Sequence, residues 1–372
     1  MTSQNLQEKI EKKFPFTLTK EQKEIVASIA DFATSISTGS IFLLKGYAGT
    51  GKTTLISALV KSLSIVAKRS VLLAPTGRAA KVISKFSNKK ASTIHRKIYW
   101  IRSGKNGNTY IKIKENMHTN SIFIVDEASM IPESSDSSFG NRSLLDDLIQ
   151  YVYDGVGCKL ILIGDTAQLP PVHLDISPAL DKDFLETTYL KNVVSVTMKE
   201  VVRQSKQSTV LLNATDLRNR IGVDDFSYPK FDVSNDVIRL DSGEELQDHL
   251  ETAYSVSDIS NTIVLCRSNK RANIYNQQIR SRIRFQENEI SVGDMLMVVR
   301  NNYFWLAEDS KAGFIANGDI VEVVRFKETI DRYGFRFARL TIQLVDYLDE
   351  KELDVIVILD TLSSEAPSLT YD

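Results

Sequence analysis

The stretch IFLLKGYAGTGKTTLISALV, residues 41–60, decides the fold of this chain. Its first four residues are apolar, as in a short buried strand, and apolar residues recur at helical spacing from Leu55 to Val60. Between them lies Gly46-x-x-x-x-Gly51-Lys52-Thr53, the complete pattern of a phosphate-binding loop that joins a strand to a helix. The stretch therefore predicts an α/β fold organised around bound phosphate.

Each residue type in this loop has a chemical reason to be there. The glycines let the backbone curl so that successive N–H groups point into one concavity, where the helix N-terminus adds positive charge. Lys52 is long enough to reach the β- and γ-phosphates of a nucleotide, and the Thr53 hydroxyl can ligate Mg²⁺. The residues expected to hold the nucleotide are Gly46, Ala48, Gly49, Thr50, Gly51, Lys52, Thr53 and Thr54.

Composition excludes several other classes of protein. The 372 residues carry a net charge of −1, with 25% charged and 42% hydrophobic residues, as in ordinary globular chains of two or three domains. The two cysteines, Cys158 and Cys266, lie far apart, which favours a reduced cytoplasmic protein over a disulfide scaffold or a zinc site. No N-terminal signal pattern occurs, and no apolar run reaches the roughly 20 residues of a membrane span.

Acidic and amide side chains follow two further apolar runs. Residues 121–125 end in Asp126-Glu127, and residues 159–163 end in Gly164-Asp165-Thr166-Ala167-Gln168. The carboxyl ends of parallel strands meet at the edge where a phosphate loop also lies. We therefore expect Asp126 to hold Mg²⁺, Glu127 to orient or deprotonate the attacking water, and Gln168 to sense a γ-phosphate. A serine-rich loop, residues 133–143, is expected to lead to an exposed helix near residues 144–153.

Several other residues admit both a structural and a functional interpretation. Gln22 has capping-box spacing from Thr19, but it could equally grip the edge of an adenine. A strand that ends in Pro75-Thr76-Gly77 offers small polar groups and backbone N–H to a second phosphate, such as one of a polynucleotide, while Arg78 could be a solvated surface charge. His95 alone is more often structural.

The run YWIRSGKNGNTYIKIK, residues 99–114, predicts a β-hairpin. Asn106-Gly107 lies between two alternating segments, which is a strong short-range hairpin signal. Aromatic residues such as Trp100 alternate with lysines and arginines. This mixture suits a nucleic-acid contact, although an ordinary two-stranded excursion with solvated lysines fits it as well.

Five motifs in one order point to a family. GYAGTGKTT, APTGRAAK, STIH, IVDEASM and GDTAQLPPV together resemble the motifs of superfamily 1 DNA helicases, in the RecD/Dda-like branch that moves 5′→3′. The resemblance implies a P-loop NTPase with RecA-like motor domains, ATP and Mg²⁺ as cofactors, and single-stranded DNA and single-strand/duplex junctions as partners. It also implies a monomer that works beside replication or repair proteins.

The same resemblance assigns roles to particular residues. It favours an adenine contact for Gln22, and VTMKEVVRQ, residues 196–204, is similar to the segment that opens the second motor domain, with Arg203 reaching the γ-phosphate. The hairpin coincides with the pin that this branch uses to split duplexes. The residues expected to contact DNA are Pro75, Thr76, Gly77, Arg78, Thr93, His95 and Trp100.

The resemblance also gives a division into domains. Residues 1–195 would form the first RecA-like domain, with the hairpin insertion at about 97–118. Residues 196–372 would form part of a second one, with a strand near 262–266, a helix at about 271–284, and an SH3-like β-barrel insertion at about 290–360. Trp305 could pack in that barrel or contact DNA.

The later motifs of the family do not occur before Asp372. We therefore expect a piece of a longer protein, in which nucleotide binding survives while coupled hydrolysis and unwinding are in doubt. The leading hypothesis is an ATP-dependent DNA helicase. The alternatives are a helicase subunit of an exodeoxyribonuclease complex, and a nucleotide-gated DNA-binding module that does not unwind.

Overall fold

The structure is a computed structural model whose chain divides into two compact units. The first consists of residues 1–206 and 218–226, and the second of residues 207–217 and 227–372. The residues that the structure describes are 2–37, 39–103, 109–133, 143–171, 174–200, 208–223, 225, 227–234, 236–256, 261–300, 302, 305–306, 310, 312, 315, 317–347 and 350–363.

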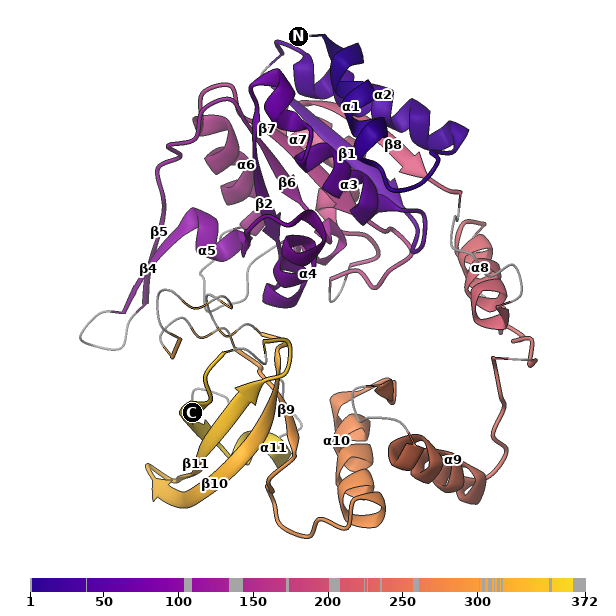
Figure 1. Ribbon diagram of the computed structural model, residues 1–372, viewed down its shortest axis with the longest axis vertical. Helices are drawn as coiled ribbons and strands as arrows, with labels where there is room; N and C mark the ends of the chain where they lie inside the picture. Colours follow the sequence, from indigo (N-terminus) through magenta and orange to yellow (C-terminus); the bar gives the residue numbers. More distant parts are fainter. Residues whose placement is uncertain are drawn as a thin grey trace. The chain divides into compact units, whose positions relative to one another are not determined.

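A six-stranded parallel sheet forms the centre of the first unit (Figure 1), and the predicted apolar runs supply its strands β1, β2, β6 and β7. Its strand order is β3-β2-β6-β7-β1-β8, so the phosphate-loop strand β1 lies between β7 and β8. The strands are β1 (Ser40–Gly46), β2 (Arg69–Ala74), β3 (Ala91–Thr93), β6 (Ser121–Val125), β7 (Lys159–Gly164) and β8 (Asn192–Met198).

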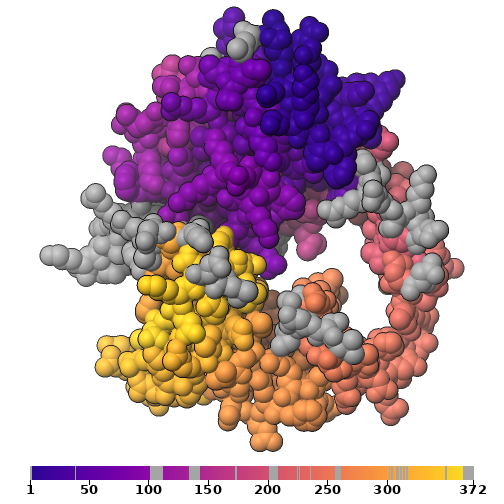
Figure 2. Space-filling view, viewed as in Figure 1, coloured from indigo at the N-terminus to yellow at the C-terminus, as the bar shows by residue number. Residues whose placement is uncertain are grey.

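Helices cover both faces of this sheet because alternate strand residues point to opposite sides. On one face Phe42 and Leu44 pack with α1 (Ser3–Lys13), α2 (Lys20–Thr34), α3 (Lys52–Val60) and α4 (Gly77–Ser87). On the other face Ile41 and Leu43 pack with α5 (Ile94–Ile98), α6 (Leu144–Asp154) and α7 (Lys182–Tyr189). The result is a three-layer α/β/α unit, and α1 and α2 make the indigo surface in Figure 2.

Helix α6 differs from its prediction as an exposed helix. Leu144, Leu145, Leu148, Ile149 and Val152 are all buried against the sheet. These residues recur at i, i+1, i+4, i+5 and i+8, which is one apolar stripe of a helix. The serine-rich segment before α6, from residue 134 to 142, lies outside the described residues.

The predicted hairpin is present as two antiparallel strands, β4 (Tyr99–Ser103) and β5 (Thr109–Ile113). Tyr99 pairs with Ile113, and Ser103 pairs with Thr109. The Asn106-Gly107 turn lies outside the described residues. At the base of the hairpin the Lys114 Nζ lies 4.9 Å from the centroid of the Trp100 ring, and 59% of Trp100 is exposed.

In the second unit the predicted strand near residues 262–266 is not formed. No residue of this segment belongs to a strand, and Ile263 and Leu265 are 80% and 86% exposed. A strand exists only where a neighbour accepts and donates its backbone hydrogen bonds, and the described residues supply no such neighbour. The helices of this part are α8 (Thr209–Ile221), α9 (Gly243–Val256) and α10 (Asn269–Gln278), which continues as a π-helical turn, η6 (Ile279–Ile283). The end of α8, from residue 218 on, is grouped with the first unit.

The second unit also contains a four-stranded antiparallel sheet where the short strands were predicted. Its order is β12-β11-β10-β9, and Val323, Ala338 and Leu340 are among its buried core residues. Trp305 is 44% exposed. The strands are β9 (Met295–Met297), β10 (Ile320–Arg332), β11 (Phe335–Leu344) and β12 (Leu353–Ile358), followed by α11 (Asp360–Ser363).

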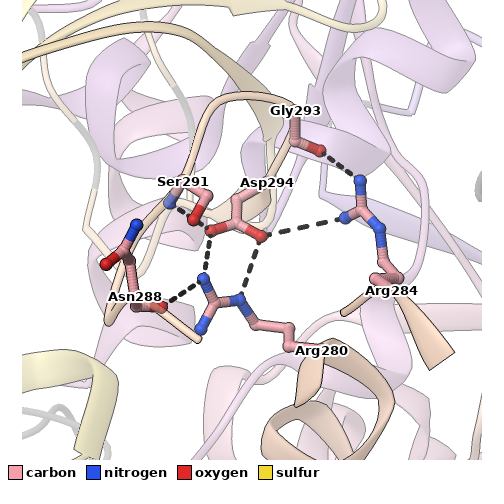
Figure 3. Close-up of polar contacts among 6 residues, drawn as sticks. All are labelled: Arg280, Arg284, Asn288, Ser291, Gly293 and Asp294. Atoms are coloured by element: carbon pink, nitrogen blue, oxygen red, sulfur yellow. Dashed lines mark hydrogen bonds and ion pairs between the residues drawn. The ribbon is translucent and has the colours of Figure 1, made fainter. Parts of the chain in front are cut away.

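A polar cluster joins this sheet to η6 (Figure 3). The Arg280 guanidinium donates to both carboxylate oxygens of Asp294, at 3.0 and 2.8 Å, and to the Asn288 carbonyl at 2.7 Å. Arg284 donates to the Gly293 carbonyl at 3.1 Å, and Asp294 is only 4% exposed. Both oxygens of the buried Asp294 carboxylate therefore accept hydrogen bonds from a charged donor. A carboxylate with such partners can be buried at a small cost in free energy.

Two simpler expectations concern cysteines and membranes. Cys158 and Cys266 are both free thiols. Within the described part of the chain, no helix combines the length and apolarity that a membrane crossing needs.

Candidate nucleotide-binding site

The candidate site lies at the carboxyl edge of the parallel sheet. Lys45 at the end of β1 pairs with Gly164 at the end of β7, and Val125 at the end of β6 pairs with Leu162 on the other side of β7. The loops after β1, β6 and β7 therefore leave the sheet side by side. These loops carry Lys52, the pair Asp126-Glu127, and Asp165 with Gln168.

The phosphate loop has the backbone that its glycines permit. Gly49 and Gly51 have φ of 81° and 94°, in the region that residues with a Cβ rarely adopt. Thr50 is fully buried, and its hydroxyl donates to the Tyr47 carbonyl at 2.8 Å. A Cβ on Gly46 would lie 2.9 Å from the Cβ of Met198, so the loop passes β8 too closely for any side chain.

Lys52 is the cation of the site. Its Nζ donates to the Tyr47 carbonyl at 3.0 Å and also to the Gly46 carbonyl. Burial lowers the pKa of Lys52, whereas the negative charges of Asp165, Glu127 and Asp126 act in the opposite direction and favour the ammonium form. The charges of these three carboxylates therefore favour the ammonium form of Lys52 beside the phosphate loop.

Asp126 is buried, and its neighbour Glu127 is half-buried. The Asp126 carboxylate accepts from the Glu127 N–H at 3.0 Å, and the Asp126 N–H donates to the Leu73 carbonyl of β2. Burial raises the pKa of both carboxyl groups, and the charge of Asp126 raises that of Glu127 further. Glu127 has φ of 54°, an uncommon left-handed conformation for a residue with a side chain, and such residues cluster at functional sites.

Asp165 is a site residue to which our sequence reasoning gave no role. It is 2% exposed, and its carboxylate accepts from the Ala167 N–H at 2.9 Å. Among the three carboxylates it has the largest effect on the Lys52 pKa. The available signal was its place at the end of β7, one strand from the phosphate loop. Gln168 lies in the same turn and is exposed.

Gln22 forms the helix cap that its spacing from Thr19 predicted, while its predicted contact with an adenine stays a prediction. Its Oε1 accepts from the Thr19 N–H at 3.1 Å, and Thr19 accepts from the Gln22 N–H, so the capping box is formed. Its Nε2 donates to the Thr50 carbonyl at 3.0 Å. Gln22 is 2% exposed and therefore binds the start of α2 directly to the phosphate loop.

The residues expected to contact DNA lie after β2 and β3. These strands pair, with Ala74 opposite Thr93, so Pro75-Thr76 and His95 leave neighbouring strands. Thr76 caps α4, and Thr93 caps α5 while it is fully buried, which favours a structural role for Thr93. Burial lowers the pKa of His95. Arg78 and Trp100 are exposed.

Two arginines are relevant to the nucleotide site. Arg203, the expected γ-phosphate contact, lies outside the described residues. Arg218, which is grouped with the first unit, lies with its guanidinium carbon 4.2 Å from the centroid of the Tyr47 ring in the phosphate loop. Its charge lowers the pKa of Lys52. No motif in the sequence marked Arg218, because the two residues are far apart along the chain.

A parallel α/β sheet, a phosphate loop with its lysine, and an acidic pair on a neighbouring strand end together define a P-loop NTPase domain. The chain belongs to the family described as AAA domain, which matches residues 17–222.

The chain is also similar to individual helicases. It is 26% identical over 296 residues to the ATP-dependent DNA helicase dda of Enterobacteria phage T4, which covers 77% of this chain and 63% of that protein. It is 29% identical over 155 residues to the ATP-dependent RecD2 DNA helicase of Deinococcus radiodurans, covering 42% of this chain and 18% of that protein. These relatives confirm the resemblance to the RecD/Dda-like branch.

Among solved structures, the Pif1 helicase from Bacteroides in complex with ADP-AlF3 and ssDNA matches with a TM-score of 0.44 and 15% identity. That match covers 91% of this chain and 74% of the Pif1 chain. The chain spans less than two thirds of the length of the two curated relatives described above.

Proposed function

We propose that the protein containing this chain is an ATP-dependent DNA helicase that moves 5′→3′ on single-stranded DNA and separates duplexes. The observation that carries the proposal is the convergence of Lys52, Asp126 and Glu127 at one edge of the parallel sheet. Similarity to two ATP-dependent DNA helicases supplies the substrate class. The proposal includes a cytoplasmic, monomeric protein that acts at single-strand/duplex junctions beside replication or repair proteins.

The residues present fit ATP with Mg²⁺. Gly49 and Gly51 have left-handed backbones, which allow successive N–H groups to point at one anion. Lys52 directly follows Gly51, so its ammonium group can bind the same phosphates. Mg²⁺ is commonly held by one or two carboxylates together with substrate phosphates, so Thr53 and Asp126 are a sufficient protein contribution. The bound metal would neutralise charge that develops on the phosphates. Ala48 and Thr54 complete the loop around them.

Glu127 is proposed as the general base. Its pKa is raised by burial and by Asp126, and a base works best when its pKa approaches the working pH. Glu127 has a left-handed backbone and directly follows Asp126, the proposed Mg²⁺ ligand. Gln168 and Arg203 are proposed to sense the γ-phosphate, and Gln22 to contact the adenine from the start of α2.

Strand binding is proposed for the carboxyl ends of β2 and β3. Thr76, Gly77 and Arg78 would contact DNA phosphates, since Thr76 and Gly77 start a helix whose N–H groups favour anions. Pro75, Thr93 and His95 would shape the same edge. Trp100 is exposed beside the Lys114 ammonium and would stack on a base, a contact worth about 1–3 kcal/mol.

A second candidate is a nucleotide-gated DNA-binding module that does not unwind. The observation that favours it is the exposed segment 262–266, where the described residues form no second parallel sheet. A motor needs two nucleotide-binding domains that close on each other, and this segment is where a strand of the second one was expected.

The deciding experiment uses the native full-length protein. We expect ATP hydrolysis that rises on addition of single-stranded DNA, and displacement of a strand from a duplex with a 5′ single-stranded tail. Lys52→Ala should abolish both, whereas Lys61→Ala, an exposed lysine at the end of the same helix, should leave both unchanged. Stimulated hydrolysis without strand displacement would favour the gated module. Hydrolysis that persists in Lys52→Ala would refute the proposed site.

A further inference from the structure

Glu21 makes contacts that neither capping nor nucleotide binding requires. It lies in the first turn of α2, immediately before Gln22. Its carboxylate accepts hydrogen bonds from the backbone N–H of Lys199, at 3.0 Å to each oxygen, and from the N–H of Glu200 at 3.0 Å. Lys199 and Glu200 are the first two residues after β8, where the chain leaves the sheet.

The phosphate loop also contacts the end of β8. The Tyr47 N–H donates to the Met198 carbonyl at 3.3 Å, and Gly46 leaves no room for a Cβ beside Met198. The exit of β8 therefore contacts two structures: the start of α2, through Glu21, and the phosphate loop, through Gly46 and Tyr47. Figure 1 shows β8 beside α2 in the first unit.

The two structures that hold the strand end are themselves connected. Gln22 donates to the Thr50 carbonyl at 3.0 Å, so the residue next to Glu21 is bonded to the middle of the phosphate loop. Adjacent residues in the first turn of one helix move together because the helix backbone is rigid. A displacement of Thr50 would therefore have a bonded route through Gln22 and Glu21 to Lys199 and Glu200.

We propose that Glu21 is a positioning residue that couples the phosphate loop to the chain leaving β8. This inference rests on the proposed function, because it assigns to Glu21 the transfer of the nucleotide state to that segment. A carboxylate suits the task because its two oxygens accept two successive N–H groups, and such charge-assisted hydrogen bonds are short and directional. The Glu21 carboxylate is bonded to the backbone of Lys199 and Glu200, so its proposed effect is exerted through these two residues.

Two variants separate this role from the general benefit of a negative charge near a helix N-terminus. Glu21→Asp keeps the charge at the helix start but is one methylene shorter, so it no longer reaches both N–H groups. Glu21→Ala removes both charge and reach. Glu24→Gln, an exposed change in the same helix, is the matched control.

The first readout is hydrogen exchange of the Lys199 and Glu200 amides in the native full-length protein, with and without a non-hydrolysable ATP analogue. In wild type we expect the analogue to change exchange at both amides. In Glu21→Asp and Glu21→Ala both amides should exchange about tenfold faster or more, as after loss of a net hydrogen bond, and should no longer respond to the analogue. Exchange that matches wild type in both variants would overturn the proposal.

The second readout is steady-state ATP hydrolysis with saturating single-stranded DNA. We expect both Glu21 variants to keep the affinity for the ATP analogue within about twofold of wild type while kcat falls about tenfold, the factor that one lost hydrogen bond supplies. An equal loss in Glu24→Gln, or a kcat that does not change, would contradict a positioning role. If wild type shows no DNA-stimulated hydrolysis, the proposed function fails while the exchange experiment still decides the role of Glu21.

Discussion

The side-chain amide of Gln22 donates to the backbone carbonyl of Thr50 at 3.0 Å while its oxygen accepts from Thr19. One buried side chain therefore closes the cap of α2 and holds the phosphate loop. The cap that the sequence allowed is formed through the amide oxygen, and the amide nitrogen has a partner in the phosphate loop that the sequence did not indicate.

Gln22→Glu tests the bond to Thr50 without removing the cap. The new carboxylate still accepts from the Thr19 N–H, but it cannot donate, and it meets the Thr50 carbonyl in a position that is 2% exposed. We expect the free energy of unfolding to fall by about 1–3 kcal/mol, measured by urea titration. Gln7→Glu on α1, where the partner is Glu11, should cost about 0.5 kcal/mol or less. Equal effects of the two changes would contradict the bond's importance.

Glu127→Gln tests the general base. The amide keeps the shape of the side chain but cannot accept a proton, so kcat for ATP hydrolysis should fall about 10²–10⁴-fold in the native full-length protein. Nucleotide affinity should change only a few-fold, since Lys52 and the loop backbone remain. Glu133→Gln, an exposed change six residues further on, should leave kcat unaltered. A kcat within tenfold of wild type would argue for another base.

Gly46→Ala tests the close passage of the phosphate loop past β8. The added Cβ would lie 2.9 Å from the Met198 Cβ, which is fixed by the strand backbone, so loop and strand must move apart. Overpacking of this kind costs about 1–3 kcal/mol, which thermal unfolding would detect. Gly39→Ala is the control, because a Cβ there meets nothing within 4 Å. Equal thermal unfolding temperatures for Gly46→Ala and Gly39→Ala would contradict this expectation.

Lys159 predicts a dependence of stability on alkaline pH. It is 1% exposed, donates to the Ser35 carbonyl at 2.7 Å and to the Phe32 carbonyl, and burial lowers its pKa to about 8. Between pH 8 and the ordinary pKa of 10.5 the unfolded chain binds more protons at this residue than the folded chain, so its contribution to the unfolding free energy rises with pH.

The measurement compares wild type with Lys159→Met from pH 7.5 to 10.5 by urea titration. Wild type should gain stability relative to the variant across this window, by at most about 3 kcal/mol. Lys61→Met, an exposed lysine, should run parallel to wild type. A constant difference between wild type and Lys159→Met would mean that the pKa of Lys159 is not lowered.

Asp294→Asn tests the cluster that joins η6 to the antiparallel sheet. The amide cannot accept from both arms of the Arg280 guanidinium, so a buried, doubly bonded group loses a partner. We expect a loss of about 1.5–3 kcal/mol in the unfolding free energy. Asp241→Asn breaks a pair with Arg239 in which both side chains are mostly exposed, and it should cost about 0.5 kcal/mol or less. A larger loss of unfolding free energy in Asp241→Asn than in Asp294→Asn would contradict a stabilising role for the Asp294 cluster.

The parallel sheet and its acidic edge could be predicted because their signals are local. Each core strand is one apolar run, and the residue that follows it, such as Asp126, must lie at the carboxyl edge. The burial of α6 was missed although its apolar stripe is present in the sequence, because the serine-rich segment before it suggested an exposed position. Asp165 was missed because Gln168 drew the functional interpretation of the same turn.

The contacts of Arg218 and Glu21 could not be predicted, because they join residues far apart in the sequence without any shared pattern. The strand predicted at residues 262–266 is not formed, for a related reason. Its apolar residues satisfy the strand pattern, but pairing depends on a neighbour that the pattern itself does not specify. The strand pattern was confirmed where a partner strand is present, as in β1, β6 and β7 of the parallel sheet.

The cluster around Asp294 has a mechanical consequence for the second unit. The two arms of Arg280 fix the carboxylate in the plane of the guanidinium, and Arg284 adds a further attachment at Gly293, so the joint resists both bending and twisting (Figure 3). We therefore expect the sheet from β9 to β12 and the helical turn η6 to move together as one rigid body.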